Sequence, residues 1–214
     1  MADELVDIYD ENYNHQGTML KSEARKKGHW ITSIHTWIIR PQNGGFVLFQ
    51  KRGAKKKIYP NTLDISAAGH YQAGEAVSEG VREIKEEMGI SVSFNELIPL
   101  GIRLDIAKLG ENYIREFCHT FLLEKNLKPS EYNLDLNEVE GLVEVSISDG
   151  LDLFSGKSDK VLSTGVEYAS EVGGWNEIQL YLTKESFIPR IDHYYYKIFM
   201  LADRYLKGDK HLAI

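Results

Sequence analysis

The sequence predicts an α+β protein, built as one compact domain with an elaborated C-terminal end. Segments rich in β-branched and aromatic residues alternate with turns over the first 150 residues, one stretch has the period of a helix, and the last third turns helical. The chain has 214 residues, of which 43% are hydrophobic. It can therefore bury one core of ordinary size, and one extended domain is expected rather than two.

Strand-like segments dominate the first two thirds of the chain. Residues 31 to 40 and 46 to 50 are rich in Ile, Thr and Phe, and the turn sequence PQNGG between them predicts a hairpin. Residues 10 to 18 have the composition of a turn, and residues 21 to 29 are expected to form a basic polar link. Further strands are predicted for residues 4 to 9, 98 to 107, 113 to 123 and 142 to 147.

One helix is predicted for residues 75 to 88. Its apolar side chains recur at spacings of four, three and four, at Val77, Val81, Ile84 and Met88. Gly89 stands where a helix C-cap is expected. This segment therefore presents one apolar stripe to a core and leaves its other side chains free for a site.

The end of the chain is expected to be a helical extension, residues 151 to 214, packed on a domain of residues 1 to 150. Its aromatic residues are Trp175, the tyrosines at 194 to 196, and Phe199. Packing against the sheet is the expected role, with a base-binding pocket or a homodimer surface as alternatives.

Charge and composition exclude several classes of partner. A net charge of −7 does not favour a nucleic acid polymer or an anionic membrane surface. The first residues are acidic rather than basic and apolar, so a cytoplasmic protein is expected. The single cysteine, Cys118, lies in an apolar run and is expected to be a buried, inert thiol.

Three carboxylates lie on one face of the predicted helix. Glu83, Glu86 and Glu87 fall within an arc of about 100° at helical spacing. Like charges at these spacings oppose the helix by roughly 0.2 to 0.5 kcal/mol per pair. Carboxylate oxygens are also the ligands that Mg²⁺ and Mn²⁺ prefer, so a metal site and a solvated acidic face are the two interpretations.

The neighbouring loops favour the metal site. A loop with Gly69 and Gly74 stands directly before the helix, where its backbone can approach phosphates closely. A second loop upstream is basic and contains Arg52, Lys55, Lys56 and Lys57. These cations are placed to meet the phosphates that a metal ion bridges.

Residues 69 to 90, GHYQAGEAVSEGVREIKEEMGI, resemble the motif that defines the Nudix hydrolases. The matching positions are Gly69, Glu75, Arg82, Glu83, Ile84, Glu86, Glu87, Gly89 and Ile90. The resemblance implies an α/β/α sandwich, with a mixed sheet between helices, and a Mg²⁺- or Mn²⁺-dependent pyrophosphatase. The family usually has seven residues between the first Glu and the Arg, whereas this chain has six, so the sequence does not establish a contact between Glu75 and Arg82.

A finer resemblance covers residues 4 to 150 and points to Nudix proteins related to isopentenyl-diphosphate isomerase. It rests on the order of TWII, VLFQKR and YPNTLDISAAGH. The positions of that enzyme's catalytic cysteine and of two histidine ligands correspond here to Ala68, Arg25 and Ile31. Alanine cannot transfer a proton and isoleucine cannot bind a metal, so isomerase activity is not expected.

The resemblance assigns the metal to Glu83, Glu86 and Glu87, joined by the Gly69 carbonyl and by Glu116, with Arg82 in the same catalytic group. Glu86 or Glu87 is the expected base and Glu116 the next candidate, although an edge-strand charge is an equal interpretation of Glu116.

Substrate phosphates are expected to meet Arg52, Lys57 and His70, while a structural histidine is an equal interpretation of His70. The resemblance implies a small diphosphate as substrate, and a nucleoside diphosphate derivative is expected. The rival functions are a diphosphate isomerase and a non-catalytic ligand sensor.

Overall fold

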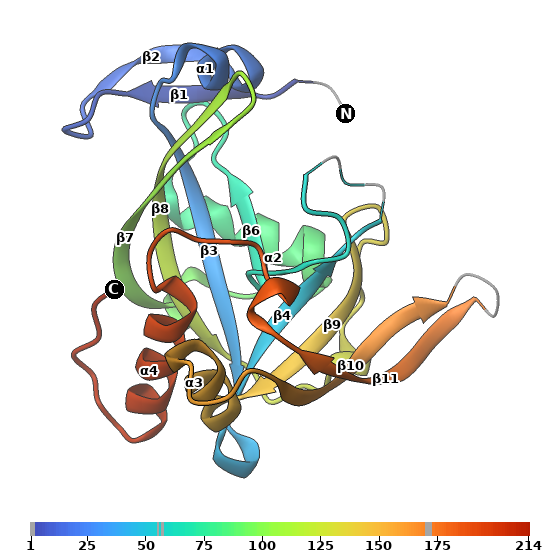
Figure 1. Cartoon of the computed structure of the whole chain (residues 1–214). Helices are drawn as coiled ribbons and strands as arrows, with labels where there is room; N and C mark the ends of the chain where they lie inside the picture. The colour runs from blue at the N-terminus through green and yellow to red at the C-terminus, as the bar shows by residue number, and fades with distance from the viewer. Residues whose placement is uncertain (1–2, 55, 57, 170–172) are drawn as a thin grey trace.

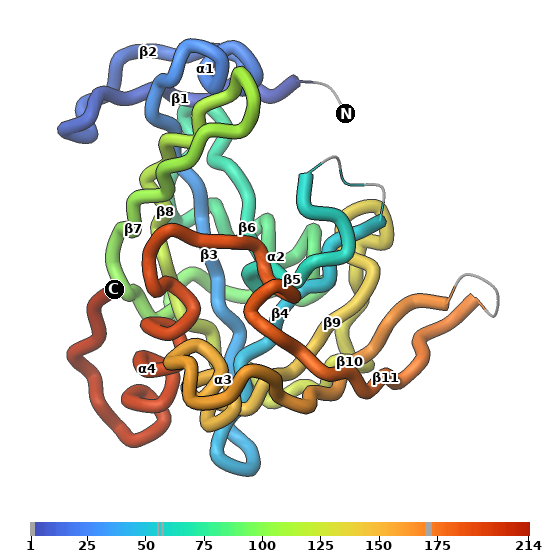
Figure 2. Tube along the Cα trace, in the orientation of Figure 1, coloured from blue at the N-terminus to red at the C-terminus, as the bar shows by residue number. Residues whose placement is uncertain are grey.

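The computed structural model describes residues 3–54, 56, 58–169 and 173–214. A nine-stranded mixed sheet dominates it, with the order β11-β10-β9-β4-β3-β8-β7, while β5 pairs with β4 and β6 with β3 (Figures 1 and 2). The strands of this sheet are β3 Ile31–Arg40, β4 Phe46–Arg52, β5 Leu63–Asp64, β6 Ala67–His70, β7 Ile98–Leu109, β8 Asn112–Glu124, β9 Val139–Ser146, β10 Val161–Ala169 and β11 Gly174–Leu182. A separate hairpin consists of β1 Leu5–Tyr9 and β2 His15–Leu20.

Four α-helices accompany the sheet in the described residues: α1 Lys21–Lys27, α2 Val81–Met88, α3 Ile147–Ser155 and α4 Tyr194–Leu206. The 3₁₀ turns are η1 Gln42–Gly44, η2 Val77–Gly80, η3 Phe94–Glu96, η4 Pro129–Glu131 and η5 Lys184–Ser186. None of the helices in these ranges is both long and apolar enough to cross a bilayer.

Helices cover both faces of the sheet, which confirms the predicted sandwich. Ile84 and Met88 of α2 pack with Ile34 and Ile38 of β3 in one core. On the opposite face, α3 and α4 pack against a second core that includes Trp37 of β3 (Figure 1). All ten residues of β3 are buried, as expected of a central strand covered on both sides.

The basic link predicted for residues 21 to 29 is wrong, since residues 21 to 27 form α1. Only Ala24 of this helix is buried, so the sequence shows no apolar stripe. The helix is set by tertiary contacts instead: Ala24 packs with Val6 and Ile8, and Gly28 ends the helix at φ 73°. The turn predicted for residues 10 to 18 is likewise shorter, because β2 begins at His15.

The prediction of a wholly helical tail also needs correction. Between α3 and α4, strands β10 and β11 form a hairpin, and β10 pairs antiparallel with β9. The backbone of β9 would otherwise present unpaired N–H and C=O groups at this edge, and β10 satisfies them. Gly165 permits the close approach, since a Cβ there would lie 2.1 Å from the Leu142 carbonyl oxygen. The main sheet thus continues across the expected boundary at residue 150.

The aromatic residues of α4 pack into the core. Tyr194, Tyr195 and Phe199 are buried. The Tyr194 hydroxyl accepts a hydrogen bond from Trp37 Nε1 at 2.8 Å and lies 3.0 Å from His35 Nδ1. This cluster joins the end of the chain to the central strand, and Trp175 packs partly buried against the other core.

Tyr194→Phe is expected to lower the free energy of unfolding by roughly 1 to 3 kcal/mol, because the buried Trp37 N–H loses its acceptor. Tyr196→Phe is the matched control, since Tyr196 is only half buried in the same helix. It should change stability by less than about 0.5 kcal/mol. Urea unfolding of the two variants measures the difference, and equal stabilities would refute the role of the hydroxyl.

Candidate active site

The candidate site is built on β6, the loop after it and α2. Strand β6 pairs with β3, with Gly69 opposite Ile34, and the chain then enters η2 and α2. The 3₁₀ turn η2 stands where the motif has one residue fewer. Four 3₁₀ residues rise about 8 Å, whereas five α-helical residues rise about 7.5 Å. The shorter segment can therefore span a similar length.

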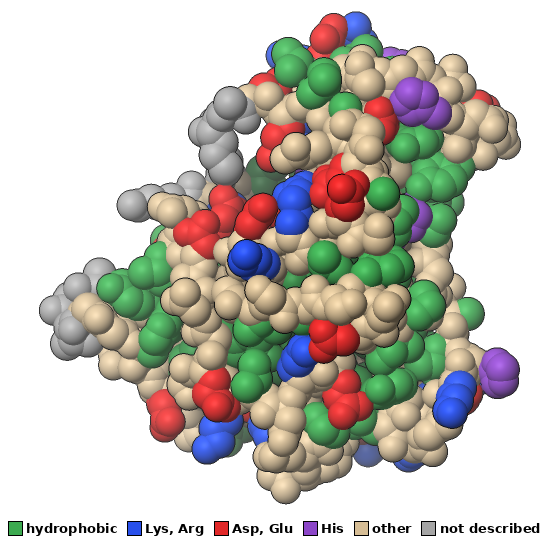
Figure 3. Space-filling model, turned by 180° about the vertical axis from the view of Figure 1, so that it is seen from behind, with side chains coloured by type: hydrophobic (Ala, Val, Ile, Leu, Met, Phe, Trp, Pro, Cys, Tyr) green, Lys and Arg blue, Asp and Glu red, His purple; other side chains and the backbone are tan. Residues whose placement is uncertain are grey.

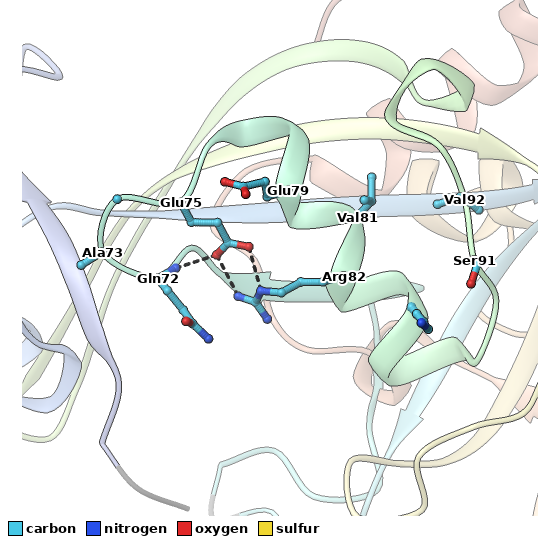
Figure 4. A pocket seen from close by; sticks show the side chains of 10 residues that line it. Gln72, Ala73, Glu75, Glu79, Val81, Arg82, Ser91 and Val92 are labelled. Atoms are coloured by element: carbon cyan, nitrogen blue, oxygen red, sulfur yellow. Dashed lines mark hydrogen bonds and ion pairs between the residues drawn. The ribbon is translucent and has the colours of Figure 1, made fainter.

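The contact between Glu75 and Arg82 is formed. Arg82 Nε donates to Glu75 Oε1 at 2.7 Å and Nη2 donates to Oε2 at 3.0 Å, a bidentate pair (Figure 4). Arg82 Nη2 also donates to the His70 carbonyl at 2.9 Å. Arg82 therefore joins the loop, the end of β6 and the helix through one side chain.

Glu83 and Glu86 converge on the same guanidinium. Arg82 Nη1 lies 2.6 Å from Glu83 Oε1 and 3.2 Å from Glu86 Oε2. Burial raises the pKa of Glu83. Gly69 is required beside it, because a Cβ at this position would lie 1.9 Å from the Glu83 carboxyl carbon. The predicted glycine therefore meets Glu83, and Glu83 and Glu86 meet at Arg82.

Glu87 is the most buried carboxyl group of the helix. Its Oε2 accepts from the Ala68 backbone N–H at 3.0 Å and from Gln50 Nε2 at 3.4 Å. Burial raises the pKa of Glu87 to about 8, and the charge of Glu83 acts in the same direction, outweighing the hydrogen bond from Ala68. By contrast, the Glu86 side chain is 59% exposed and faces solvent.

Glu116 belongs to a different cluster. Its Oε1 lies 2.9 Å from Arg25 Nη2 and 3.0 Å from His70 Nε2. Burial would raise the pKa of Glu116, but the charges and hydrogen bonds of His70 and Arg25 hold it well below its ordinary value. From the sequence, Arg25 is known only as the position where the related isomerase has a histidine ligand. It is the residue that sequence reasoning missed, because α1 itself was not predicted.

A preformed metal cluster is absent from the described ranges, since no three His, Cys, Asp or Glu side chains are grouped to hold an ion. The carboxylates expected to bind the metal lie in two groups, each bound by basic side chains. Arg82 binds Glu83 and Glu86. Arg25 and His70 bind Glu116. The α2 carboxylates still fit a divalent cation chemically. Two of them converge on one positive group, and the buried Glu87 has no cationic partner among the described ion pairs.

The expected phosphate ligands are only partly placed at the site. Arg52 donates to Asp64 Oδ2 at 3.0 Å and to the Tyr59 and Ile58 carbonyls at 3.2 Å each, so it holds the loop before β5. Lys57 lies outside the described residues. His70 is in the site, where its ring bonds Glu116.

A shallow depression of about 620 Å³ lies on the outer side of the loop and helix. Glu75, Glu79, Arg82 and Ser91 are among its lining residues (Figure 4). Glu83, Glu86 and Glu87 do not line it. The depression therefore exposes one side of the ion pair between Glu75 and Arg82, and it does not include the three carboxylates of α2.

A second network of buried charges lies on the sheet face that carries Glu116. Arg103 and Asp105 of β7 are opposite Cys118 and Glu116 of β8. Arg190 binds both Asp64 and Asp105, and Arg103 binds Asp105 and Asp192. This network fastens the segment before α4 to β5 and β7. Cys118 beside it is fully buried, and burial raises the pKa of its thiol, in agreement with an inert cysteine.

Comparisons with known proteins agree with the motif. No family model matches the chain. It is 36% identical over 203 residues to an uncharacterized Nudix hydrolase of Clostridium acetobutylicum, which covers 94% of this chain and 98% of that relative. Nothing in that name places the chain near isopentenyl-diphosphate isomerase, so the finer resemblance stays a prediction.

Solved structures share the fold. A crystal structure from Deinococcus radiodurans has a TM-score of 0.54 at 21% identity, over 72% of this chain and 90% of the other. A MutT/nudix family protein from Enterococcus faecalis has a TM-score of 0.51 at 15% identity, over 85% of this chain and 64% of the other. At this low sequence identity, the two similarities show a shared fold alone.

Glu87→Gln is expected to flatten the pH dependence of stability when divalent ions are chelated. Because burial raises the folded-state pKa of Glu87 from 4.5 to about 8, the folded protein keeps a proton that the unfolded chain releases. The stabilisation is complete below about pH 4.5 and is lost as the pH rises toward about 8, at about 1.4 kcal/mol per pKa unit. The total loss over this range is about 5 kcal/mol.

Urea unfolding in EDTA between about pH 5 and about pH 8.5 measures this slope. Glu79→Gln is the control, because Glu79 is exposed in η2 and its variant should keep the wild-type slope. A wild-type slope in Glu87→Gln would show that this carboxyl titrates normally.

Proposed function

The chain belongs to the Nudix hydrolase family, and on this premise we propose that it cleaves the phosphoanhydride bond of a diphosphate linked to another group, with Mg²⁺ or Mn²⁺ as cofactor. A nucleoside diphosphate derivative is the proposed substrate class. Water then adds across the P–O–P bond, and both products carry a phosphate group.

One observation carries this proposal: Arg82 binds Glu75 and also Glu83 and Glu86. The six-residue spacing could have separated Glu75 from Arg82 and left a protein that binds ligands without turnover. Because the contacts are formed, the chain retains the arrangement that the motif implies. This favours a hydrolase over a sensor.

Glu83, Glu86 and Glu87 are the residues proposed to hold the metal, together with the Gly69 carbonyl. When bound, the ion neutralises charge on the diphosphate and lowers the pKa of a water molecule. Arg82 positions Glu83 and Glu86 from one side, and the Ala68 N–H fixes Glu87 from the other. Since Glu116 is bound by Arg25 and His70, we assign it to orienting these two side chains rather than to the metal.

The proton acceptor proposed here is Glu86. Glu87 is buried and its Oε2 is bonded to the backbone, whereas the Glu86 carboxylate faces solvent and meets one guanidinium nitrogen. Glu116 is a poor base, because its contacts with His70 and Arg25 hold its pKa well below the ordinary value.

Arg25 and His70 are proposed to bind the phosphate that is not attacked. They lie on the same side of the sheet as Glu116, and Arg25 is 28% exposed. The guanidinium offers further N–H donors beyond the one that Glu116 accepts. Arg52 and Lys57 remain proposed phosphate ligands of the substrate's outer part.

Glu86→Gln is expected to reduce metal-dependent phosphate release by about 100-fold or more, because an amide is a weak ligand and cannot accept the proton. The assay uses a panel of nucleoside diphosphate derivatives with coupled phosphatase detection and Mg²⁺ present. Glu79→Gln is the matched control and should keep wild-type rates, since Glu79 lies outside the carboxylate face.

The outcomes separate the rival functions. Release that depends on both Mg²⁺ and Glu86 supports hydrolysis. Tight binding of a panel compound by the wild type without any turnover supports the sensor and overturns the proposal.

Metal binding should also be visible without substrate. Mg²⁺ at about ten times its dissociation constant is expected to raise the Tm by about 3 °C or more, because it binds only the folded state. The double variant Glu83→Gln/Glu86→Gln should lose this shift, while Glu79→Gln should keep it. A shift that persists in the double variant would place the metal elsewhere.

A further inference from the structure

Strand β7 has its apolar and charged faces reversed. Arg103 and Asp105 point inward and are 5% and 8% exposed, whereas Ile102, Leu104 and Ile106 point outward and are 44%, 51% and 45% exposed. A strand at the margin of a sheet normally buries its apolar side chains and exposes its charges. The inward charges are explained by the Arg190 network, but nothing within the described chain covers the outward apolar stripe.

The backbone edge of β7 is also free. Strand β7 is the last in the sheet order, so alternate N–H and C=O groups point away from β8 (Figure 1). In the described part of the chain, the backbone hydrogen bond on this side is from Ile214 N to Leu100 O at 2.9 Å. This contact closes the edge at Leu100 and leaves residues 101 to 107 open.

Hydrophobic side chains gather along the corresponding margin in the space-filling view, on the right when the molecule is seen from behind (Figure 3). An exposed apolar stripe on a free strand edge is a site for pairing with another strand. The surface therefore fits a partner that adds a strand to the edge of β7.

We propose that this partner is a second copy of the chain, and that two β7 strands pair antiparallel about a twofold axis at Leu104. In this register Leu104 meets its symmetry mate, and Ile102 meets Ile106 of the partner subunit. Gly101 then lies opposite residue 107 of the other copy. The pairing spans the seven open residues and stops at Leu100, whose carbonyl already binds Ile214.

The sequence of β7 is self-complementary in this register, which is the reason to choose a second copy over a foreign chain. On the outward face, the three apolar residues of each copy together form a cluster of six. On the inward face Arg103 lies opposite Asp105 of the partner subunit, so each cross-strand pair joins opposite charges. A strand that binds itself about a twofold axis needs this reciprocity.

The contact is small, since seven paired residues and one apolar stripe bury less than the roughly 1,200 Å² of a standard interface. The dimer is therefore expected to be concentration-dependent. Sedimentation at protein concentrations from about 1 to about 100 µM covers the range in which such interfaces dissociate. The mass should rise from 24.4 kDa toward twice that value.

Leu104→Lys is expected to keep the protein monomeric over this range, because two ammonium groups would meet at the axis. Leu162→Lys is the matched control. Leu162 is 45% exposed, but it lies on β10, an interior strand of the sheet, so its variant should dimerise as the wild type does. Circular dichroism checks that both variants are folded.

Cysteine cross-linking tests the register. Directly opposed residues of an antiparallel pair have Cα atoms about 4.5 to 5.5 Å apart, within disulfide range. Leu104→Cys should therefore form a covalent dimer with a mild oxidant. Two cysteines from Ile106→Cys would lie about 13 Å apart and should not cross-link. Cys118 is buried and does not interfere.

A wild type that stays monomeric at all concentrations overturns the proposal. So does a dimer that Leu104→Lys leaves intact, because it would use another surface. Cross-linking of Ile106→Cys in preference to Leu104→Cys overturns the register. Loss of the dimer with Leu104→Lys, together with selective cross-linking at 104, supports both surface and register.

Discussion

The site depends on one guanidinium group. Arg82 binds the loop through Glu75, the end of β6 through the His70 carbonyl, and its own helix through Glu83 and Glu86. Without this cation, three carboxylates crowded on a short helix would repel one another. Burial would lower the pKa of Arg82, but the surrounding carboxylates raise it, so the charge is permanent. The loop, the strand and the helix are thus held by these charges on one side, while Ile84 and Met88 pack in the core on the other.

Charge pairing also holds the other side of the site. Glu116 is buried on the sheet, where an unpaired carboxylate would be costly. Arg25 supplies the compensating charge, and His70 contacts the same carboxylate oxygen. Arg25 comes from α1, so the N-terminal segment is part of the site although its helix buries only Ala24. Glu87 is the exception among these acids, because its partners in the described contacts are neutral donors.

Strand β7 connects the interior of the molecule with its surface. Its inward charges bind Arg190 and Asp192, which fasten the segment before α4 to the sheet. Since side chains alternate along a strand, turning Arg103 and Asp105 inward forces three apolar residues outward. The exposed stripe therefore follows from a network that the fold requires, and a second copy that covers it would remove its exposure to water.

The sequence by itself determined the α+β class, the central strands, the C-terminal part of the helix predicted for residues 75 to 88 and the three glutamates on it, because period and composition are local properties. The α-helix begins at Val81, six residues later than predicted, and residues 77 to 80 form the 3₁₀ turn η2. The sequence did not determine α1, which has no apolar stripe, or the hairpin of β10 and β11. Ile178, Leu180 and Leu182 alternate in β11 and are a local strand signal, but the pairing of β10 with β9 depends on the tertiary structure. Only the tertiary structure decided which charges meet. Arg25 and Glu116 are 91 positions apart, and Arg190 and Asp64 are 126 apart. A buried carboxylate requires a cation, but which cation it receives depends on which segments the fold brings together.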